Sequence, residues 1–252
     1  MSLPIGRLVP YRVFSGVENM SLDQMLQESV DQNQQIALRF YGWREPTLSF
    51  GYFQSYQERH SHQVSNSVSC VRRATGGGTL LHHHELTYSL TIPQTLGAIG
   101  PRLDVYQQVH ECISKALLNY GVMVKPFSKT QNGLCGKGNC EQFLCFQRRT
   151  AEDLILNGYK VVGSAQRKSR ASLLQHGSLL LSASPYAPEL PGVNDLVAQR
   201  LGLMEVMDSI IEHLSDSFQI QLREDDFLDQ EIARAAEIAE MRFGNERWLH
   251  RR

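Results

Sequence analysis

The chain has 252 residues, of which 42% are hydrophobic and 20% are charged, and its formal net charge is −1. This length and composition allow a globular protein whose core needs neither disulfides nor a structural metal. A net charge near zero excludes a general nucleic-acid binder, because that role requires a dominant cationic field. We therefore expect no nucleic-acid partner.

The sequence lacks signals for export or membrane insertion. No window approaches eighteen apolar residues, and prolines and charges interrupt the first twenty residues, so neither a spanning helix nor a signal peptide is expected. The cysteines form an odd set at low density, which is typical of reduced thiols: Cys70, Cys112, Cys135, Cys140 and Cys145. We expect a cytoplasmic protein that does not bind membranes.

The N-terminal half is predicted to contain one helix followed by strands. Ser21 is a favourable N-cap for a helix whose apolar face includes Leu22, Met25 and Leu26. Strands are expected over residues 36–43, 47–52, 67–73 and 86–92. The first two strands are expected to pair around Arg44-Glu45-Pro46.

The C-terminal half is predicted to combine helices with a hairpin. Apolar spacing predicts a helix over residues 104–120, which Gly121 ends, and Asn157-Gly158 is a strong hairpin signal. The other expected elements are strands over 154–156, 160–163 and 173–181 and helices near 194–216 and 225–240. Strands in runs with few, long helices favour one α+β domain over residues 1–252, which includes the C-terminal helices 194–240.

A glycine triplet, Gly76-Gly77-Gly78, lies between two predicted strands and follows Arg72-Arg73. Successive glycines let a backbone approach a ligand closely and present N–H groups at dihedral angles that other residues resist. The alternative is a strained turn without a ligand. The two arginines favour the ligand site, because guanidinium groups are suited to a carboxylate or phosphate.

Lys160 follows the predicted hairpin turn. The simplest interpretation is a solvated strand lysine. The flanking Val161-Val162 and the small residues Gly163-Ser164-Ala165 indicate instead a close-packed site, in which a desolvated lysine places a cation beside a group that needs it.

Cys145 and His176 are the other candidate reactive side chains. An isolated cysteine in apolar company, here beside Phe146, is normally a core residue, and its reactivity depends on a neighbouring cation. His176-Gly177 interrupts an otherwise aliphatic strand, which fits either a satisfied core histidine or a substrate-pocket residue.

A metal site is not expected. Adjacent strand residues point to opposite faces, so at most two members of His82-His83-His84 share a ligand. Cys135, Cys140 and Cys145 lack the two-residue gaps of zinc knuckles. Residues 128–142 are rich in Gly, Asn and Lys, and are predicted to form a mobile loop.

Together these segments resemble the superfamily of lipoate-protein ligase A, biotin ligases and octanoyltransferases. The matching segments are Arg72–His82, Glu85–Ser89, Asp153–Ile155, Lys160–Gln166 and Leu174–Ser178. Within that superfamily the chain is most similar to cysteine-dependent octanoyltransferases, which place Cys-Phe shortly before a Lys-Val-hydrophobic-Gly-Ser-Ala motif. Cys145-Phe146 stands fifteen residues before Lys160.

The resemblance implies one lipoate/biotin ligase-like catalytic domain, with mixed β-sheets flanked by helices and a hydrophobic tunnel. It implies that Cys145, as a thiolate stabilised by Lys160, takes an octanoyl group from octanoyl-acyl carrier protein. The implied acceptor is a lysine of a lipoyl-domain protein, either the glycine cleavage H protein or a 2-oxoacid dehydrogenase E2. The implied substrate-binding residues are Arg73, Gly76, Gly77, Gly78, His82, Gly163, Ser164, Ala165, His176 and Gly177. No metal or other cofactor is expected.

Three other functions remain open at this point. An ATP-dependent lipoate-protein ligase would use ATP and Mg²⁺ with a free acid. An octanoyl amidotransferase would move the acyl group between lipoyl domains. A carrier-protein binding module would leave Cys145 as a core residue. If transfer is carrier-dependent, basic residues at 148–149 and 167–170 are expected to attract the acidic carrier.

Overall fold

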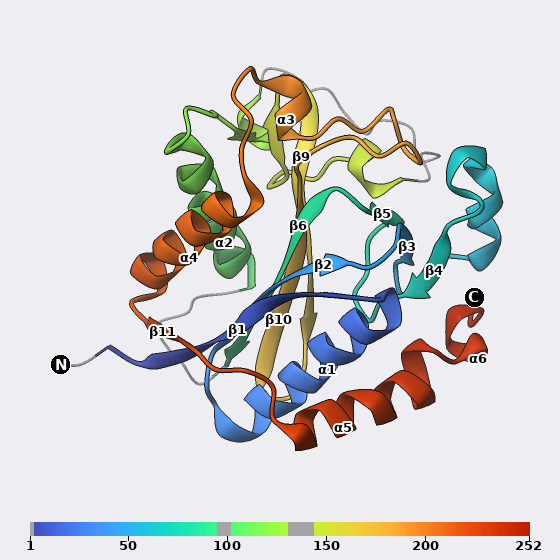
Figure 1. The fold of residues 1–252 in the computed structure, drawn as a ribbon, viewed down its shortest axis with the longest axis vertical. Coiled ribbons are helices and arrows are strands. Elements are labelled where there is room, and N and C mark those ends of the chain that lie inside the picture. Colours follow the sequence, from blue (N-terminus) through green and yellow to red (C-terminus); the bar gives the residue numbers. More distant parts are fainter. Residues whose placement is uncertain (1–2, 95–101, 131–143) are drawn as a thin grey trace.

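The computed structural model describes residues 3–94, 102–130 and 144–252, and it contains a large and a small β-sheet (Figure 1). The large sheet has eight strands in the order β11-β1-β2-β6-β10-β9-β8-β7. Its strands are β1 (Ile5–Phe14), β2 (Ala37–Trp43), β6 (Glu85–Pro93), β7 (Lys125–Pro126), β8 (Leu154–Leu156), β9 (Tyr159–Lys168), β10 (Ser172–Leu180) and β11 (Gln221–Glu224). The pairs β11-β1 and β1-β2 are parallel and the others are antiparallel. The α+β class with mixed sheets is therefore confirmed.

The small sheet has the order β4-β3-β5 and consists of β3 (Thr47–Phe50), β4 (Ser69–Arg72) and β5 (Leu80–His82). The predicted pairing of segments 36–43 and 47–52 is wrong. Both edges of β2 are occupied, by β1 and β6, so β3 passes to the second sheet and pairs with β4 and β5. The glycine loop thus connects two strands of the small sheet.

The first helix, α1 (Gly16–Asn33), begins earlier than predicted. Ser15 is the N-cap, and its side chain and that of Glu18 form a reciprocal capping box. Ser21 is buried inside the helix, where its hydroxyl donates to the carbonyl of Val17. The Ser21 N-cap prediction is therefore wrong, because the capping box at Ser15 satisfies the helix terminus six residues earlier.

The remaining α-helices lie around the two sheets. They are α2 (Arg102–Leu118), α3 (Val193–Leu196), α4 (Leu203–Phe218), α5 (Asp229–Ile238) and α6 (Glu246–Leu249), with a π-helical turn over Ala239–Phe243. Of these helices, α6 lies next to β4 of the small sheet. Gly121, just beyond α2, has a φ of +75°, as its predicted stop position requires. The predicted helix near 194–216 is instead two helices, α3 and α4. No helix in the described ranges has the length and apolarity needed to cross a bilayer.

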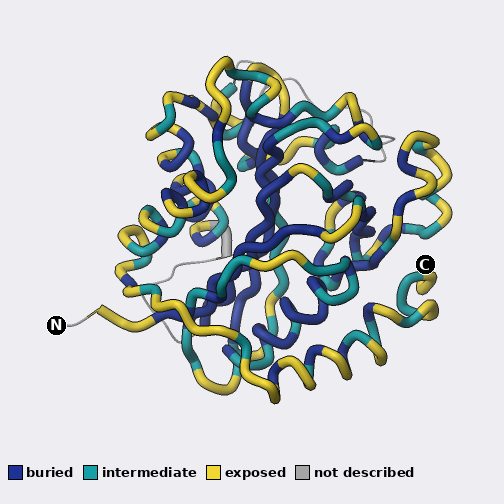
Figure 2. The backbone as a smooth tube through the Cα atoms, in the orientation of Figure 1, coloured by how far each residue is buried: buried dark blue, intermediate teal, exposed yellow. Residues whose placement is uncertain are grey.

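Helices cover both faces of the large sheet, which places a buried layer on each side (Figures 1 and 2). On one face α2 and α4 pack on the sheet, with Val109 and Ile210 in a shared core that also contains Leu90. On the other face α1 and α5 form a second core, which includes Met25 and Ile238. Strands buried on both faces explain why every residue of β6 and β10 is buried.

The hairpin prediction is confirmed. Asn157 and Gly158 have φ values of 48° and 85° and join β8 to β9. This turn sets the register that places Lys160 at the start of a long strand. The predicted loop over 128–142 and the two cysteines Cys135 and Cys140 lie almost wholly outside the described residues.

Candidate active site

One cavity gathers nearly all the candidate residues. We call it the cysteine cavity, and it has about 480 Å³ of free space, with its open mouth included. The predicted residues that line it are Arg73, Gly76, Gly77, His82, Cys145, Lys160, Gly163, Ser164, Ala165, His176 and Gly177. Gly78 does not line the cavity but packs against Cys145, because a Cβ at Gly78 would lie 3.3 Å from the Cα and Cβ of the cysteine.

Arg73 holds the glycine loop in place. Its Nη1 donates to the carbonyl of Ser49 at 2.6 Å, and its Nη2 donates to the carbonyls of Gly76 and Gly78 at 2.8 and 2.7 Å. The described ion pairs include none with Arg73, and its buried Nε has no hydrogen-bond partner. Burial lowers the pKa of Arg73 to about 10, and negative charge at Cys145 opposes that shift. Arg73 is thus a buried cation without a carboxylate partner, beside a cysteine.

Arg72 points away from the cavity. Its Nε donates to the carbonyl of Leu249, and its Nη1 donates to the carbonyls of Gly51 and Gln54. The side chain therefore fastens the C-terminal segment to the small sheet. The interpretation that both arginines face a ligand is wrong for Arg72.

Cys145 begins a single 3-10 turn, Cys145–Gln147, which is tied to the glycine loop. Its N–H donates to the carbonyl of Thr79 at 2.6 Å, and Leu144 forms a β-bridge with the same threonine. Leu144 and Phe146 are buried, whereas Cys145 is only half-buried and borders the cavity. The neighbours are core residues, and the cysteine itself is open to a ligand.

Lys160 is buried, and its Nζ lies 2.9 Å from the carboxylate of Asp153, which is also buried. The Nζ also donates to the carbonyl of Arg148 at 3.4 Å and lies 5.1 Å from the centre of the Phe146 ring. Gly163 leaves room for this side chain, because a Cβ there would lie 2.5 Å from the lysine Cε. The sequence did not single out Asp153 as a partner, although an acid immediately before the strand pair was an available signal.

Ser164 is held by polar groups that the sequence did not identify. The Nδ1 of His110 faces the carbonyl of Glu152 at 2.7 Å, so Nδ1 carries a proton and Nε2 accepts from the Ser164 hydroxyl. Burial lowers the pKa of His110 to about 4, which keeps this ring neutral. The hydroxyls of Tyr88 and Tyr106 bond to the Oγ and the carbonyl of Ser164. Ser164 therefore fixes the backbone around the cavity, since its hydroxyl is already bonded.

His176 forms part of the wall of the cysteine cavity. Its Nδ1 lies 3.1 Å from Asp23, and its Nε2 lies 2.7 Å from the hydroxyl of Thr75 in the glycine loop. Asp23 is fully buried and also pairs with Arg39 at 3.0 Å, and the hydrogen bond with His176 and the charge of Arg39 outweigh burial to lower the pKa of its carboxyl. This network joins α1 to the loop.

His82 is similarly occupied. Its Nδ1 lies 2.6 Å from Glu85, its Nε2 lies 2.7 Å from the Ser49 hydroxyl, and its ring stacks on Trp43 at 3.8 Å. Both ring nitrogens thus have protein partners. Within the described ranges, no group of three His, Cys, Asp or Glu residues is placed to hold a metal ion.

We predict that Gly177 is required for the stability of this site. A Cβ there would lie 2.2 Å from the Ser164 Oγ and 2.7 Å from the Gly163 carbonyl, so Gly177→Ala is expected to lower the free energy of unfolding by about 1–3 kcal/mol. The measurement is urea denaturation. Gly76→Ala is the matched control, because its Cβ would meet only Phe53, at 3.9 Å. Equal stability of the two variants would contradict the prediction.

Comparisons with known proteins agree with this architecture. The model of the lipoyl protein ligase A/B catalytic domain family matches residues 15–228. Octanoyltransferase LipM from Carboxydothermus hydrogenoformans is 27% identical over 276 residues, which cover 97% of this chain and 98% of that protein.

Two solved structures share the fold. A lipoate protein ligase from T. acidophilum with bound lipoic acid has a TM-score of 0.78 at 20% identity, and the match covers 100% of both chains. A bi-partite lipoate protein ligase with its E2 lipoyl domain, from Thermoplasma acidophilum, has a TM-score of 0.76 at 20% identity, covering 98% of this chain and 97% of that one.

Proposed function

The chain belongs to the lipoyl protein ligase A/B catalytic domain family, and on that premise we propose that it transfers an octanoyl group from octanoyl-acyl carrier protein to a lysine of a lipoyl-domain protein. The observation that supports this most directly is that Cys145 and Lys160 border one cavity with the glycine loop. The near full-length similarity to an octanoyltransferase supports the acyl group. The neighbouring ligase described with its E2 lipoyl domain supports the acceptor class. We place the reaction in the cytoplasm, since the odd, sparse cysteines fit reduced thiols.

In the first half-reaction the Cys145 thiolate attacks the carbonyl carbon of the carrier thioester. A carbon–sulfur bond forms, and the electron pair of the carbonyl moves to oxygen. The oxyanion then collapses, the carrier thiolate leaves, and octanoyl-Cys145 remains.

In the second half-reaction the neutral amine of the acceptor lysine attacks the octanoyl thioester. The amide forms, the amine loses a proton, and Cys145 leaves as a thiolate, while the carrier thiolate gains the equivalent of that proton. Arg73 and Lys160 contribute positive charge near the sulfur in both steps, although Asp153 neutralises much of the charge of Lys160. No nucleotide enters this sequence of bonds.

The cavity walls suit an alkyl chain. Met20, Trp43 and Leu80 line the cavity with apolar atoms, and Tyr41 adds an aromatic ring. Burying the seven carbons that follow an octanoyl carbonyl contributes roughly 5–6 kcal/mol at about 0.8 kcal/mol for each methylene. This term favours a medium-length chain over acetyl.

We predict that the donor is a thioester and not a free acid. Incubation of the enzyme with octanoyl-carrier protein and apo-lipoyl domain is expected to add one octanoyl mass to the domain, measured by intact mass spectrometry. Free octanoate with ATP and Mg²⁺ is expected to add none. Labelling of the domain only when free octanoate, ATP and Mg²⁺ are supplied would establish the ligase alternative. Labelling only when an octanoylated lipoyl domain is the donor would establish amidotransfer.

A further inference from the structure

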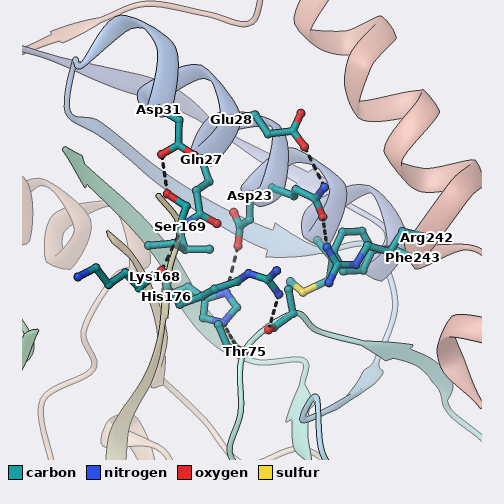
Figure 3. Close-up of a pocket in the computed structure, with 15 residues that line it drawn as sticks. Asp23, Gln27, Glu28, Asp31, Thr75, Lys168, Ser169, His176, Arg242 and Phe243 are labelled. Atoms are coloured by element: carbon teal, nitrogen blue, oxygen red, sulfur yellow. Dashed lines mark hydrogen bonds and ion pairs between the residues drawn. The ribbon is translucent and has the colours of Figure 1, made fainter. Parts of the chain in front are cut away.

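A second pocket lies beside the cysteine cavity, and we call it the arginine pocket (Figure 3). It has about 640 Å³ of free space, with its open mouth included. Its walls are α1, the glycine-loop residues Ala74 and Thr75, the adjoining ends of β9 and β10, and the C-terminal segment with Arg242 and Phe243. His176 and Met20 line both the arginine pocket and the cysteine cavity. The two hollows are therefore neighbours that share these two side chains.

The acidic side chains of this pocket are already bonded. Asp23 pairs with Arg39, and Glu28 pairs with Arg234, and both arginines lie outside the pocket lining. The third carboxylate, Asp31, accepts a hydrogen bond from the hydroxyl of Ser169, as Figure 3 shows. Two of the three acids are therefore neutralised by arginines outside the lining, and Asp31 alone lies in the pocket without an ion pair among the described residues.

The basic side chains are not matched in this way. Arg242 donates to the side-chain oxygen of Gln24, and Arg167 donates to the carbonyl of Ala74. Neither forms an ion pair in the described part of the chain. Burial, with the neighbouring cations Arg167 and Arg251, lowers the pKa of Arg242 to about 10. The pocket therefore gathers like charges that a bound anion would neutralise.

The positive charge and the guanidinium donors of this pocket indicate which kind of ligand it can bind. A lysine ammonium from the acceptor would meet net repulsion here. A phosphate group matches guanidinium donors in both charge and geometry. Of the substrates in the proposed reaction, the carrier-bound donor has a phosphate at a fixed covalent separation from the thioester, in its phosphopantetheine arm.

Resting on the proposed function, we propose that the arginine pocket binds the phosphate of the donor's phosphopantetheine arm while the thioester enters the cysteine cavity. The extended arm is comparable in length to about five residues of chain, a reach of ~17 Å. The two hollows share His176 and Met20 as lining residues, so we expect an arm of this reach to bridge them past the glycine loop. Arg167, one of the basic residues expected to attract the carrier, lies on this route through its bond to Ala74.

The test compares two donors that differ only in phosphate, octanoyl-4′-phosphopantetheine and octanoyl-pantetheine. The measured quantity is the ratio of their kcat/KM values for acylation of Cys145, followed by thiol release. In the wild type we expect the ratio to exceed about 10, from one or two charge-assisted hydrogen bonds. Arg242→Gln is expected to reduce the ratio to within about twofold of 1, and Arg242→Lys to an intermediate value. Arg247→Gln is the matched control, because it removes an exposed arginine of the same segment that does not line the pocket, so the ratio should persist.

The outcomes separate the possible failures. A wild-type ratio near 1 overturns the proposal. If inorganic phosphate then slows acylation by both donors equally, the pocket is a site for a free anion and not for the phosphate of the arm. A high ratio that survives Arg242→Gln overturns the assignment to this pocket. If octanoyl-carrier protein itself does not acylate Cys145 in the wild type, the proposed function fails instead. Thermal melting of each variant shows whether a lost ratio reflects a lost fold.

Discussion

Cys145→Ala is expected to abolish octanoyl transfer, with a rate at least about a thousandfold below that of the wild type. The alanine removes the sulfur that forms the acyl-enzyme, and the described cavity offers no other thiol to replace it. The wild type incubated with octanoyl-carrier protein should gain one octanoyl mass that hydroxylamine removes. The alanine variant should gain none.

Two other cysteines supply controls for this result. Cys70 and Cys112 lie outside the cavity, and burial raises the pKa of each thiol, which disfavours the reactive thiolate. Cys70→Ala and Cys112→Ala should therefore transfer at close to the wild-type rate if they remain folded. Transfer by Cys145→Ala at the wild-type rate would contradict the covalent mechanism and favour a ligase in which the cysteine is structural.

The sequence predicted which residues meet, because most of them belong to short motifs whose local structure is strongly determined. Asn157-Gly158 fixes a hairpin, the hairpin fixes the position of Lys160, and the glycine triplet forms a loop between strands. Of the twelve proposed site residues, only Gly78 does not line the cavity, and it packs on Cys145. Their chemical roles remain predictions.

The missed features depend on contacts between distant segments. The pairing of β3 with β4 follows from the occupied edges of β2, which depend on strands as far away as β6. The neutral state of His110 results from burial under Ser164, fifty-four residues later in the chain. The orientation of Arg73 depends on the carbonyls of a loop folded around it. Local propensity carries no information on such contacts.

The charges around Cys145 lead to a prediction about its reactivity with pH. Iodoacetamide alkylates the thiolate, so the pH midpoint of alkylation moves with any charge that favours or disfavours that anion. Lys160→Ala removes a cation and the ion-pair partner of Asp153, so the midpoint should rise, by about one pH unit. Asp153→Asn removes the anion and leaves the lysine charge, so the midpoint should fall.

Variants of Arg73 show, in the same assay, whether this side chain acts on Cys145 through its charge or by supporting the fold. Arg73→Gln removes the buried cation that responds electrostatically to Cys145, so the midpoint should rise, whereas Arg73→Lys retains the charge and should shift it less. Arg72→Gln is the matched control, because Arg72 is the adjacent, equally buried arginine, and it bonds to Leu249 and Gln54 outside the cavity. If Arg72→Gln and Arg73→Gln shift the midpoint equally, both arginines act by supporting the fold. If neither Lys160→Ala nor Arg73→Gln shifts it, the thiolate depends on neither cation, and Lys160 is left with a role in binding substrate or in holding Asp153 and the Arg148 carbonyl.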